Sequence, residues 1–327
     1  MRRPRRSDPA KLMHHRARQL LRRSAHDARA SLNEIKGRQR LSFEGLHGEY
    51  EGLLDRVSDE PLGEFLSLGW RHLYARSFNK ESLRALPFSF LRPQHGFLDK
   101  FGVFPGKEFV RTKLAFLEAR LAPERLSEVL TEDFVGEPEL YAARPLFSPW
   151  NIIHLDHLIR FSEATRCDLK SVRSVVEWGG GFGNMAKIMR RLGPDLRTHV
   201  VIDLPRVSCL QWLYLATIFG KDDVRFLKSP EEPVSPGKIN LLPVSSLAGR
   251  RLEADLFLST FALSESSEHS IDLCSRDWFG AKHLLLSFQA NDNCWWRPEE
   301  VGARARRAGA VIEEIHPPPH ASWYAFR

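Results

Sequence analysis

The chain has 327 residues, 43% of them hydrophobic, which suffices for one large domain or two modest ones and excludes an intrinsically disordered protein. No apolar run approaches the roughly 20 residues that a membrane-spanning helix needs. The formal net charge of +7 is concentrated in residues 1–30, where ten Lys and Arg face two Asp and Glu, while the remaining chain is nearly balanced. A body without a basic surplus argues against specific nucleic-acid binding.

Residues 1–30 are predicted to form a basic, solvated and partly disordered arm with enough positive charge to touch an acidic surface. Its Arg-rich start lacks the apolar stretch of a secretory signal. The cysteines are scattered without a CxxC pair, so we expect reduced thiols in a cytoplasmic protein and neither disulfides nor a zinc site. They are Cys167, Cys209, Cys274 and Cys294. The pattern leaves the oligomeric state open.

Residues 31–147 are expected to be mainly helical and to form a lid or acceptor-binding region. Two stretches carry apolar residues at helical spacing, and prolines mark the loops between them. The first stretch contains Leu62, Phe65, Leu66, Trp70, Leu73 and Tyr74, and the second contains Phe109, Val110, Leu114, Phe116, Leu117 and Leu121.

A change of pattern at Ser148-Pro149, a favourable helix start, marks the beginning of a second predicted domain over 148–327. From there apolar, β-rich runs alternate with amphipathic helices, as in parallel βαβ units. The predicted fold class is therefore α/β, with a Rossmann-like, mostly parallel sheet that ends in a β-hairpin. Strands are predicted over Ser174–Trp178, His199–Asp203, Ile239–Val244, Ala254–Thr260 and Lys282–Gln289, and the hairpin over Ala310–His316 and Ser322–Phe326.

The run Val175–Gly183 (VVEWGGGFG) predicts a buried strand, a glycine-rich turn and the start of a helix. Glycine lets the backbone approach a ligand, and the free N–H groups of a helix start can meet its polar atoms. Asp203 ends the next strand, twenty residues after Gly183, where a carboxylate can accept hydrogen bonds from both ribose hydroxyls. This pairing predicts a nucleoside-containing cofactor. Because Gly181–Ala186 also fits the GxGxxA fingerprint, NAD is a competing cofactor.

Glu177 completes the pattern E-x-G-x-G-x-G, which resembles motif I of class I S-adenosylmethionine-dependent methyltransferases. Further segments are similar to the sugar O-methyltransferase family of bacteria over roughly residues 135–327. They are Asp203-Leu204-Pro205 followed by Leu210–Leu215, then Asp255–Glu265, then Ser287–Ala290. Phe182 stands where the family would have Tyr. The resemblance implies S-adenosylmethionine as cofactor and methyl transfer to a hydroxyl of a sugar or glycan precursor.

The resemblance also implies roles for individual residues. Gly179, Gly181 and Gly183 would line the methionine moiety of the cofactor. Glu177 would anchor the loop or meet the cofactor's amino group through water. The remaining implied contacts are Asp203 at the ribose, Leu204 as a further cofactor contact, Ser245 and Ser246 at the adenine edge, and the segment from Thr260 to Glu265, which would face both cofactor and acceptor.

A sugar hydroxyl is a poor nucleophile, so a general base should assist the transfer. His154 and His157 lie three apart on the helix from Pro149 and share its inward face, which makes them the first candidates; packing histidines are the alternative. Glu265 is the next candidate, with a carboxylate at a helix N-terminus as its structural alternative. Asp156 would point away from both histidines, so no metal site is predicted.

Weaker hypotheses concern polar residues near the chain end. Asp292 and Asn293 could contact a polar acceptor, and Trp295-Trp296 could stack on a sugar, although turn and packing roles are the ordinary explanations. His283 is expected to be structural, and His320 to lie in a solvated loop. The leading hypothesis is an O-methyltransferase for a small-molecule or glycan acceptor. An NAD-dependent oxidoreductase and a non-catalytic cofactor-fold module remain as alternatives.

Overall fold

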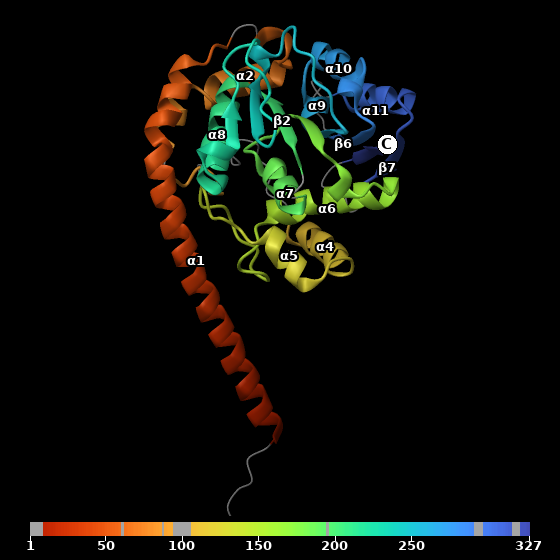
Figure 1. Ribbon diagram of the computed structural model, residues 1–327. Coiled ribbons are helices and arrows are strands. Elements are labelled where there is room, and N and C mark those ends of the chain that lie inside the picture. The colour runs from red at the N-terminus through yellow and green to blue at the C-terminus, as the bar shows by residue number, and fades with distance from the viewer. Residues whose placement is uncertain are drawn as a thin grey trace, which may run out of the picture.

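The computed structural model describes residues 9–59, 62–86, 88–93, 106–193, 196–290, 297–315 and 321–327, with side chains from residue 32 onward. Its centre is an eight-stranded sheet of order β3-β4-β2-β1-β5-β6-β8-β7 (Figure 1). All neighbouring strands are parallel except β8, which runs antiparallel to both β6 and β7. The strands are β1 Ser174–Trp178, β2 Thr198–Asp203, β3 Val224–Phe226, β4 Ile239–Pro243, β5 Leu256–Thr260, β6 His283–Gln289, β7 Val311–Glu314 and β8 Ser322–Phe326.

Helices surround the sheet and also make up the N-terminal region of the described chain (Figure 1). Those before the sheet are α1 Pro9–Arg56, α2 Leu68–Ser77, α3 Lys80–Arg84, α4 Lys107–Glu118, α5 Pro123–Leu130 and α6 Pro149–Thr165. Those between the strands are α7 Asn184–Leu192, α8 Pro205–Phe219, α9 Ala262–Glu265, α10 Glu268–Ser275 and α11 Pro298–Arg307. Short 3₁₀ turns link several of these elements.

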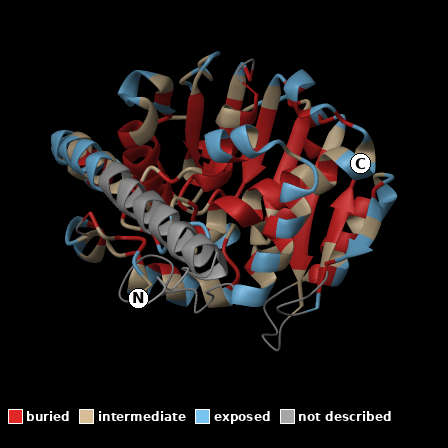
Figure 2. Cartoon of the chain, turned by 90° about the horizontal axis from the view of Figure 1, so that it is seen from below, coloured by how far each residue is buried: buried red, intermediate tan, exposed pale blue. Residues whose placement is uncertain are grey.

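The sheet is the middle of three layers. Consecutive side chains of a strand point to opposite faces, so two neighbouring residues of β8 show what covers each face. Tyr324 of β8 contacts His157 of α6 on one face. Trp323, its neighbour in the chain, stacks on Phe288 of β6, whose ring meets α11 at Gly302. Helices α6 and α11 therefore cover opposite faces, with α7 beside α6 and with α9 and α10 beside α11. Figure 2 shows the strands as a buried band between exposed outer helix surfaces.

The predicted fold class is confirmed: the sheet is mostly parallel, helices cover both faces, and a C-terminal hairpin closes the chain. The predicted strands agree with the observed ones to within two residues, except that the hairpin's first strand is shorter and His316 lies outside the described residues. The edge strand β3 was not predicted, because three residues are too few to show an alternating pattern. Ser148 caps α6 as expected, its hydroxyl accepting a hydrogen bond from the Asn151 amide at 3.3 Å.

Between β1 and β5 the strand order reverses direction, since β2, β4 and β3 lie on one side of β1 and β5, β6, β8 and β7 on the other. Loops that leave the carboxyl ends of β1 and β5 therefore diverge and leave a crevice between them. Ligands of open α/β sheets bind at such a switch point. The glycine loop after β1 and the Thr260–Glu265 segment at β5 border this point.

The N-terminal helices pack against the sheet domain. Helix α1 lies along α8 and projects beyond the molecule's body (Figure 1), and it runs without a break across residue 30. The segment before α2 is bound to the segment after α9: Leu66 forms an antiparallel bridge with Ser266, and the Ser267 amide donates to the Phe65 carbonyl at 3.2 Å. Within the described residues no helix is long and apolar enough to cross a membrane.

Candidate active site

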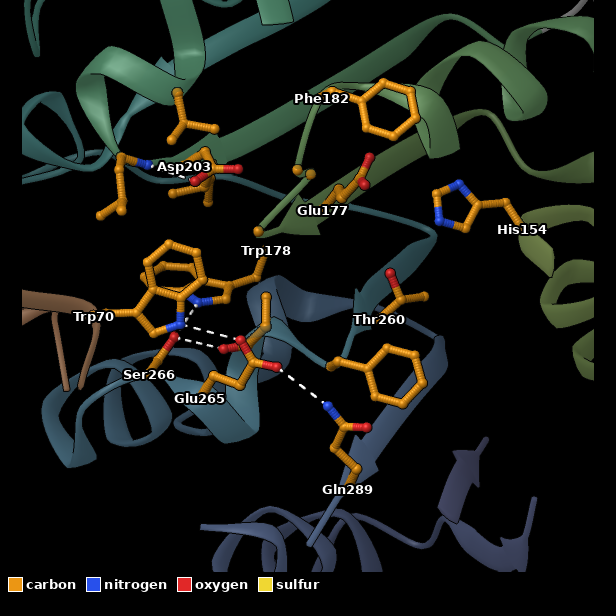
Figure 3. Close-up of a pocket in the computed structure, with 18 of the residues that line it drawn as sticks. Trp70, His154, Glu177, Trp178, Phe182, Asp203, Thr260, Glu265, Ser266 and Gln289 are labelled. Atoms are coloured by element: carbon orange, nitrogen blue, oxygen red, sulfur yellow. Dashed lines mark hydrogen bonds between the residues drawn. The ribbon is translucent and has the colours of Figure 1, made fainter. Parts of the chain in front are cut away.

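A cavity of about 300 Å³ opens at the switch point (Figure 3). Its floor is built from the carboxyl ends of β1, β2 and β5 and from residues just after β4 and at the end of β6. Its other walls come from α6 and from two N-terminal segments around Trp70 and Phe109. Most of its surface is apolar and aromatic, and three carboxyl side chains reach it: Glu177, Asp203 and Glu265.

The loop after β1 needs glycine for two different reasons. Gly179 has φ +75°, and a Cβ there would lie 2.0 Å from the Cβ of Ala262, so the loop passes close to α9. Gly181 has φ +57°, but a Cβ there would meet nothing within 4 Å. Gly181 therefore faces open space in the cavity wall. Gly183 has φ +96° and packs against Leu215 of α8, which leaves it out of the cavity lining.

Glu177 lines the cavity from the end of β1 and is buried. Its Oε2 lies 2.8 Å from Nε2 of His199 on β2. Because this histidine is equally buried, the pair holds the carboxyl group in one orientation. The arrangement fits the anchoring role that the resemblance implies for Glu177.

Asp203 ends β2 on the same cavity as the glycine loop, as the sequence predicts (Figure 3). Its carboxylate accepts hydrogen bonds from the Leu204 amide and from Nε2 of Gln211, both at 2.7 Å. The same Gln211 nitrogen donates to the Gly181 carbonyl at 2.9 Å and so connects loop and carboxylate. Burial raises the pKa of Asp203 to about 7, although these hydrogen bonds favour the charged form.

Of the cofactor contacts that the resemblance implies between β2 and β5, one lines the cavity and two do not. Leu204 lines the cavity beside Asp203. Ser245 and Ser246 are absent from its lining, since they lie in a 3₁₀ turn where the Ser246 carbonyl accepts a hydrogen bond from Arg250 at 2.9 Å. Val244, immediately before them, faces the cavity instead. The cavity wall after β4 is therefore apolar at this position.

Glu265 lies at the opposite end of the cavity from Asp203 (Figure 3). Its Oε2 accepts a hydrogen bond from Nε1 of Trp70 at 3.1 Å, and its Oε1 accepts one from Nε2 of Gln289 at 3.4 Å. Both donors are neutral. Burial therefore raises the pKa of Glu265 to about 7 against the pull of these two hydrogen bonds. Thr260, at the end of β5, faces the same space.

The backbone just after β5 is strained. Phe261 has φ +69°, a conformation that L-residues other than Asn and Asp seldom adopt. Its amide donates to the Ser287 carbonyl of β6 at 2.7 Å, which holds the strained residue in place. Strain of this kind concentrates at functional sites, and here it lets the ring of Phe261 line the cavity.

Both candidate histidines of α6 line the cavity, and their ring centroids are 6.3 Å apart. His154 Nδ1 lies 2.9 Å from the side-chain nitrogen Nδ2 of Asn184. Burial, together with nearby Lys187, lowers the pKa of His154 to about 3. His157 Nδ1 lies 2.6 Å from the Tyr324 hydroxyl. Burial lowers the pKa of His157 well below its usual value, and its Nε2 is buried without a partner.

Other predicted residues lie away from this arrangement. Asp156 does not join the histidines; it is buried against Lys113 of α4 and also bonds Arg160 at 3.0 Å. Among the described residues no three His, Cys, Asp or Glu side chains gather as metal ligands would. His283 packs against Phe161 at the domain's far end. Asp292, Asn293, Trp295, Trp296 and His320 fall outside the described residues.

Several cavity residues were not predicted from the sequence as site residues. Trp70 and Phe65 carry a helical apolar pattern that marks them only as core positions. Gln289 ends β6, where residues of a parallel sheet commonly face ligands, so its position was a usable signal. Gln211 belongs to a segment of the family resemblance, yet its bond to Asp203 depends on α8 folding back over the loop.

Comparison with known proteins gives remote structural likenesses only. No protein-family model and no curated protein matches the chain. An O-methyltransferase family protein from Burkholderia thailandensis is 16% identical over 54% of this chain and 59% of that one, with a TM-score of 0.35. This chain therefore spans less than two thirds of that protein's length.

Two further solved structures resemble the chain to a similar degree. A SAM-dependent methyltransferase from Aquifex aeolicus is 16% identical, with 66% of this chain and 96% of that one covered and a TM-score of 0.37. Magnesium protoporphyrin IX methyltransferase from Synechocystis PCC 6803, with bound SAH, is 10% identical over 53% and 81% of the two chains, with a TM-score of 0.38. At such scores these likenesses carry no functional argument.

Proposed function

We propose that this chain is an S-adenosylmethionine-dependent O-methyltransferase that methylates a hydroxyl of a small molecule, and that this acceptor is a sugar or glycan precursor. The observation that carries the proposal is one cavity, at the switch point of the sheet, which Asp203 and the glycine loop both line. Gly181 leaves open space for a ligand there, and Asp203 offers a carboxyl group to it. These residues fit a nucleoside cofactor.

In this proposal the cofactor supplies an electrophilic methyl carbon on a sulfonium. Asp203 would accept hydrogen bonds from the ribose, Gly179 and Gly181 would pass beside the methionine part, and Glu177 would hold the loop. Ribose hydroxyls that donate to the Asp203 carboxylate would favour its charged form and offset the cost of its burial. Leu204 and Val244 would give the adenine an apolar edge.

Glu265 is the group that we assign as the general base. Its pKa near 7 matches the optimum for a base at neutral pH, whereas a histidine with a pKa near 3 is a weak proton acceptor. Glu265 would accept the hydroxyl proton of the acceptor as the acceptor oxygen takes the methyl group that a bound S-adenosylmethionine would supply. Trp70 and Gln289 orient that carboxylate through their hydrogen bonds.

The histidines take supporting roles. His154 stays neutral at physiological pH and can present a hydrogen-bonding nitrogen to the acceptor. His157 is tied to Tyr324 and keeps the wall of the cavity in shape. Aromatic side chains around Trp70 exclude water from the reacting centre and offer faces on which a sugar ring can stack.

Isothermal calorimetry with S-adenosylhomocysteine, S-adenosylmethionine and NAD tests the cofactor assignment. We expect both adenosyl ligands to bind the wild type and NAD not to bind. Asp203→Asn should weaken the adenosyl ligands, while Asp222→Asn, an exposed aspartate away from the cavity, should not. Binding of NAD alone would support the oxidoreductase hypothesis, and adenosyl binding without turnover of any acceptor would favour a non-catalytic module.

A further inference from the structure

The charged side chains in the described cavity wall are all of one sign, negative. Three carboxyl side chains line it, and no Lys or Arg is found among the described lining residues. The two lining histidines are held neutral, with the pKa of His154 lowered to about 3 and that of His157 lowered well below its usual value, in both cases chiefly by burial. A ligand that enters this cavity therefore meets no positive side chain in the described wall.

Two buried lysines do lie behind the histidines, but carboxylates already neutralise them. Lys187 bonds Glu132 at 3.1 Å and lies 3.6 Å from Asp133. Lys113 is paired with the buried Asp156. Neither lysine lines the cavity. They are therefore unable to supply the counter-charge that an anionic ligand would require.

The Glu265 end of the cavity, where the acceptor is proposed to bind, holds its carboxylate differently from the Asp203 end, where the cofactor is proposed to bind. Asp203 receives a backbone amide and Gln211, whereas Glu265 is held by the indole of Trp70 and the amide of Gln289, among aromatic rings. Phe65 and Trp178 line the same cavity with ring centroids 6.5 Å apart. The Trp178 indole donates to the Ser266 hydroxyl at 3.0 Å (Figure 3). Neutral donors and aromatic faces suit an uncharged or positively charged ligand.

We propose that the acceptor enters this cavity without a negative charge, so that the sugar being methylated is free or glycoside-linked and not a sugar phosphate or sugar nucleotide. A phosphate brought beside Glu265 would lose its hydration and face a like charge, with no Lys or Arg among the described residues of the cavity wall. This inference rests on the proposed function and specifies its substrate class. It also orders the reactions: glycosyl transfer, or removal of phosphate, must precede methylation.

The first test is transfer of labelled methyl from S-adenosylmethionine to matched sugars. Glucose, galactose and mannose would each be offered as the methyl glycoside, the 1-phosphate and the nucleoside diphosphate sugar. We expect turnover of neutral members, with kcat/KM for the matched phosphorylated members lower by ~100-fold or more. A phosphorylated member that is used as well as its neutral partner would overturn the inference.

The second test needs no knowledge of the sugar. Binding to the protein saturated with S-adenosylhomocysteine at pH 8.5, where Glu265 is mostly ionised, would be measured for three ring-matched probes: 4-hydroxybenzyl alcohol, tyramine and 4-hydroxybenzoate. We expect the neutral and cationic probes to bind at least ~10-fold more tightly than the anionic one. Equal binding of the anion, or no binding by the neutral and cationic probes together with no turnover of any neutral sugar, overturns the inference.

Glu265→Gln provides the matched variant. Glu265→Gln should reduce the difference in affinity between the neutral or cationic probes and 4-hydroxybenzoate. Glu253→Gln, which removes an exposed carboxylate outside the cavity, should leave that difference unchanged. An unchanged preference in Glu265→Gln would contradict the role assigned to this carboxylate. If S-adenosylhomocysteine fails to bind the wild type, the proposed function fails; if it binds and anionic acceptors are used, only the present inference fails.

Discussion

The two ends of the cavity hold the same kind of group in different ways. At one end Asp203 is bound by its own neighbour Leu204 and by Gln211, eight residues further along the chain. At the other end Glu265 is bound by Trp70, 195 residues earlier, and by Gln289. Burial raises the pKa of both carboxyl groups to about 7.

One end of the site is therefore built from residues close together in the chain, and the other from segments far apart in it. A strand, a glycine turn, a second strand and the first turns of α8 build the Asp203 end, and all of these parts lie within residues 174–211. The Glu265 end exists only where the segment before α2 docks against α9, through Leu66 and Ser266. We therefore expect substitutions at the first end to act on cofactor binding and those at the second to act on the acceptor and on catalysis.

The largest expected effect is a loss of activity, without loss of cofactor affinity, on substitution at the Glu265 end. Glu265→Gln should lower kcat/KM by ~100-fold or more, the usual contribution of a general base, with S-adenosylhomocysteine affinity unchanged. In the wild type at saturating S-adenosylmethionine, kcat/KM for the acceptor should rise with pH and level off above about 7, where Glu265 is ionised. This limb should vanish in Glu265→Gln and persist in His154→Gln. A pH profile governed by His154 would reassign the base.

The next effect is steric and concerns the glycine loop. Gly179→Ala places a Cβ 2.0 Å from that of Ala262 at a φ of +75°. We expect a loss of ~2–4 kcal/mol in the free energy of unfolding, from overpacking and backbone strain, and weaker cofactor binding. Gly181→Ala is the matched control, since its Cβ meets nothing and only the cost of its φ, ~1–2 kcal/mol, remains. Urea unfolding measures both, and equal losses would contradict the close approach.

Asp203→Asn tests the other carboxyl group. Loss of a charged acceptor of ribose hydrogen bonds should weaken S-adenosylhomocysteine by ~10- to 100-fold. Because the pKa of free Asp203 is about 7, wild-type affinity should also decrease as the pH falls from 8 to 6. Calorimetry across that range measures the decrease. An affinity independent of pH in the wild type, or an undiminished affinity in the variant, would place the ribose elsewhere.

A smaller effect is expected at the link between the N-terminal helices and α9. Trp70→Phe keeps an aromatic ring but removes the Nε1 donor, 3.1 Å from Glu265. One lost hydrogen bond to a charged group should raise the acceptor KM or lower kcat by ~5- to 20-fold, with cofactor affinity unchanged. Steady-state kinetics with saturating S-adenosylmethionine measures this. If cofactor affinity falls instead, the two ends are not separate in function.

The smallest effect is on stability and compares the two carboxyls directly. A carboxyl group whose pKa is raised in the folded protein stabilises the fold fully below its unfolded pKa, near 4, and this contribution is lost as the pH rises through about 7. The ligand-free protein should therefore lose stability between about pH 4 and 7, by on the order of 1 kcal/mol for each group given the solvent in the cavity. Thermal unfolding should show a shallower loss in Asp203→Asn and in Glu265→Gln than in the wild type.

Much of the sheet domain was predictable because its signals are local. The glycine-rich turn, the β-rich runs and Ser148 each report on a few neighbouring residues, and the α/β fold class follows from their alternation. Burial within a helix was harder to predict. Lys187 of α7 is a charged residue, yet it is fully buried, where Glu132 and Asp133 from another segment neutralise it. No periodic pattern reveals that compensation.

The strand–glycine–helix unit, the acidic residue at the end of β2 and the closing hairpin could be predicted from the sequence, because short-range sterics and hydrophobic periodicity suffice to specify them. Tertiary structure alone decided that Val244 and not Ser245 faces the cavity, that Asp156 turns to Lys113, and that Trp70 meets Glu265. Each of those outcomes depends on contacts between segments far apart in the chain. Such contacts depend on how whole layers pack against one another, and no spacing pattern in a single sequence predicts them.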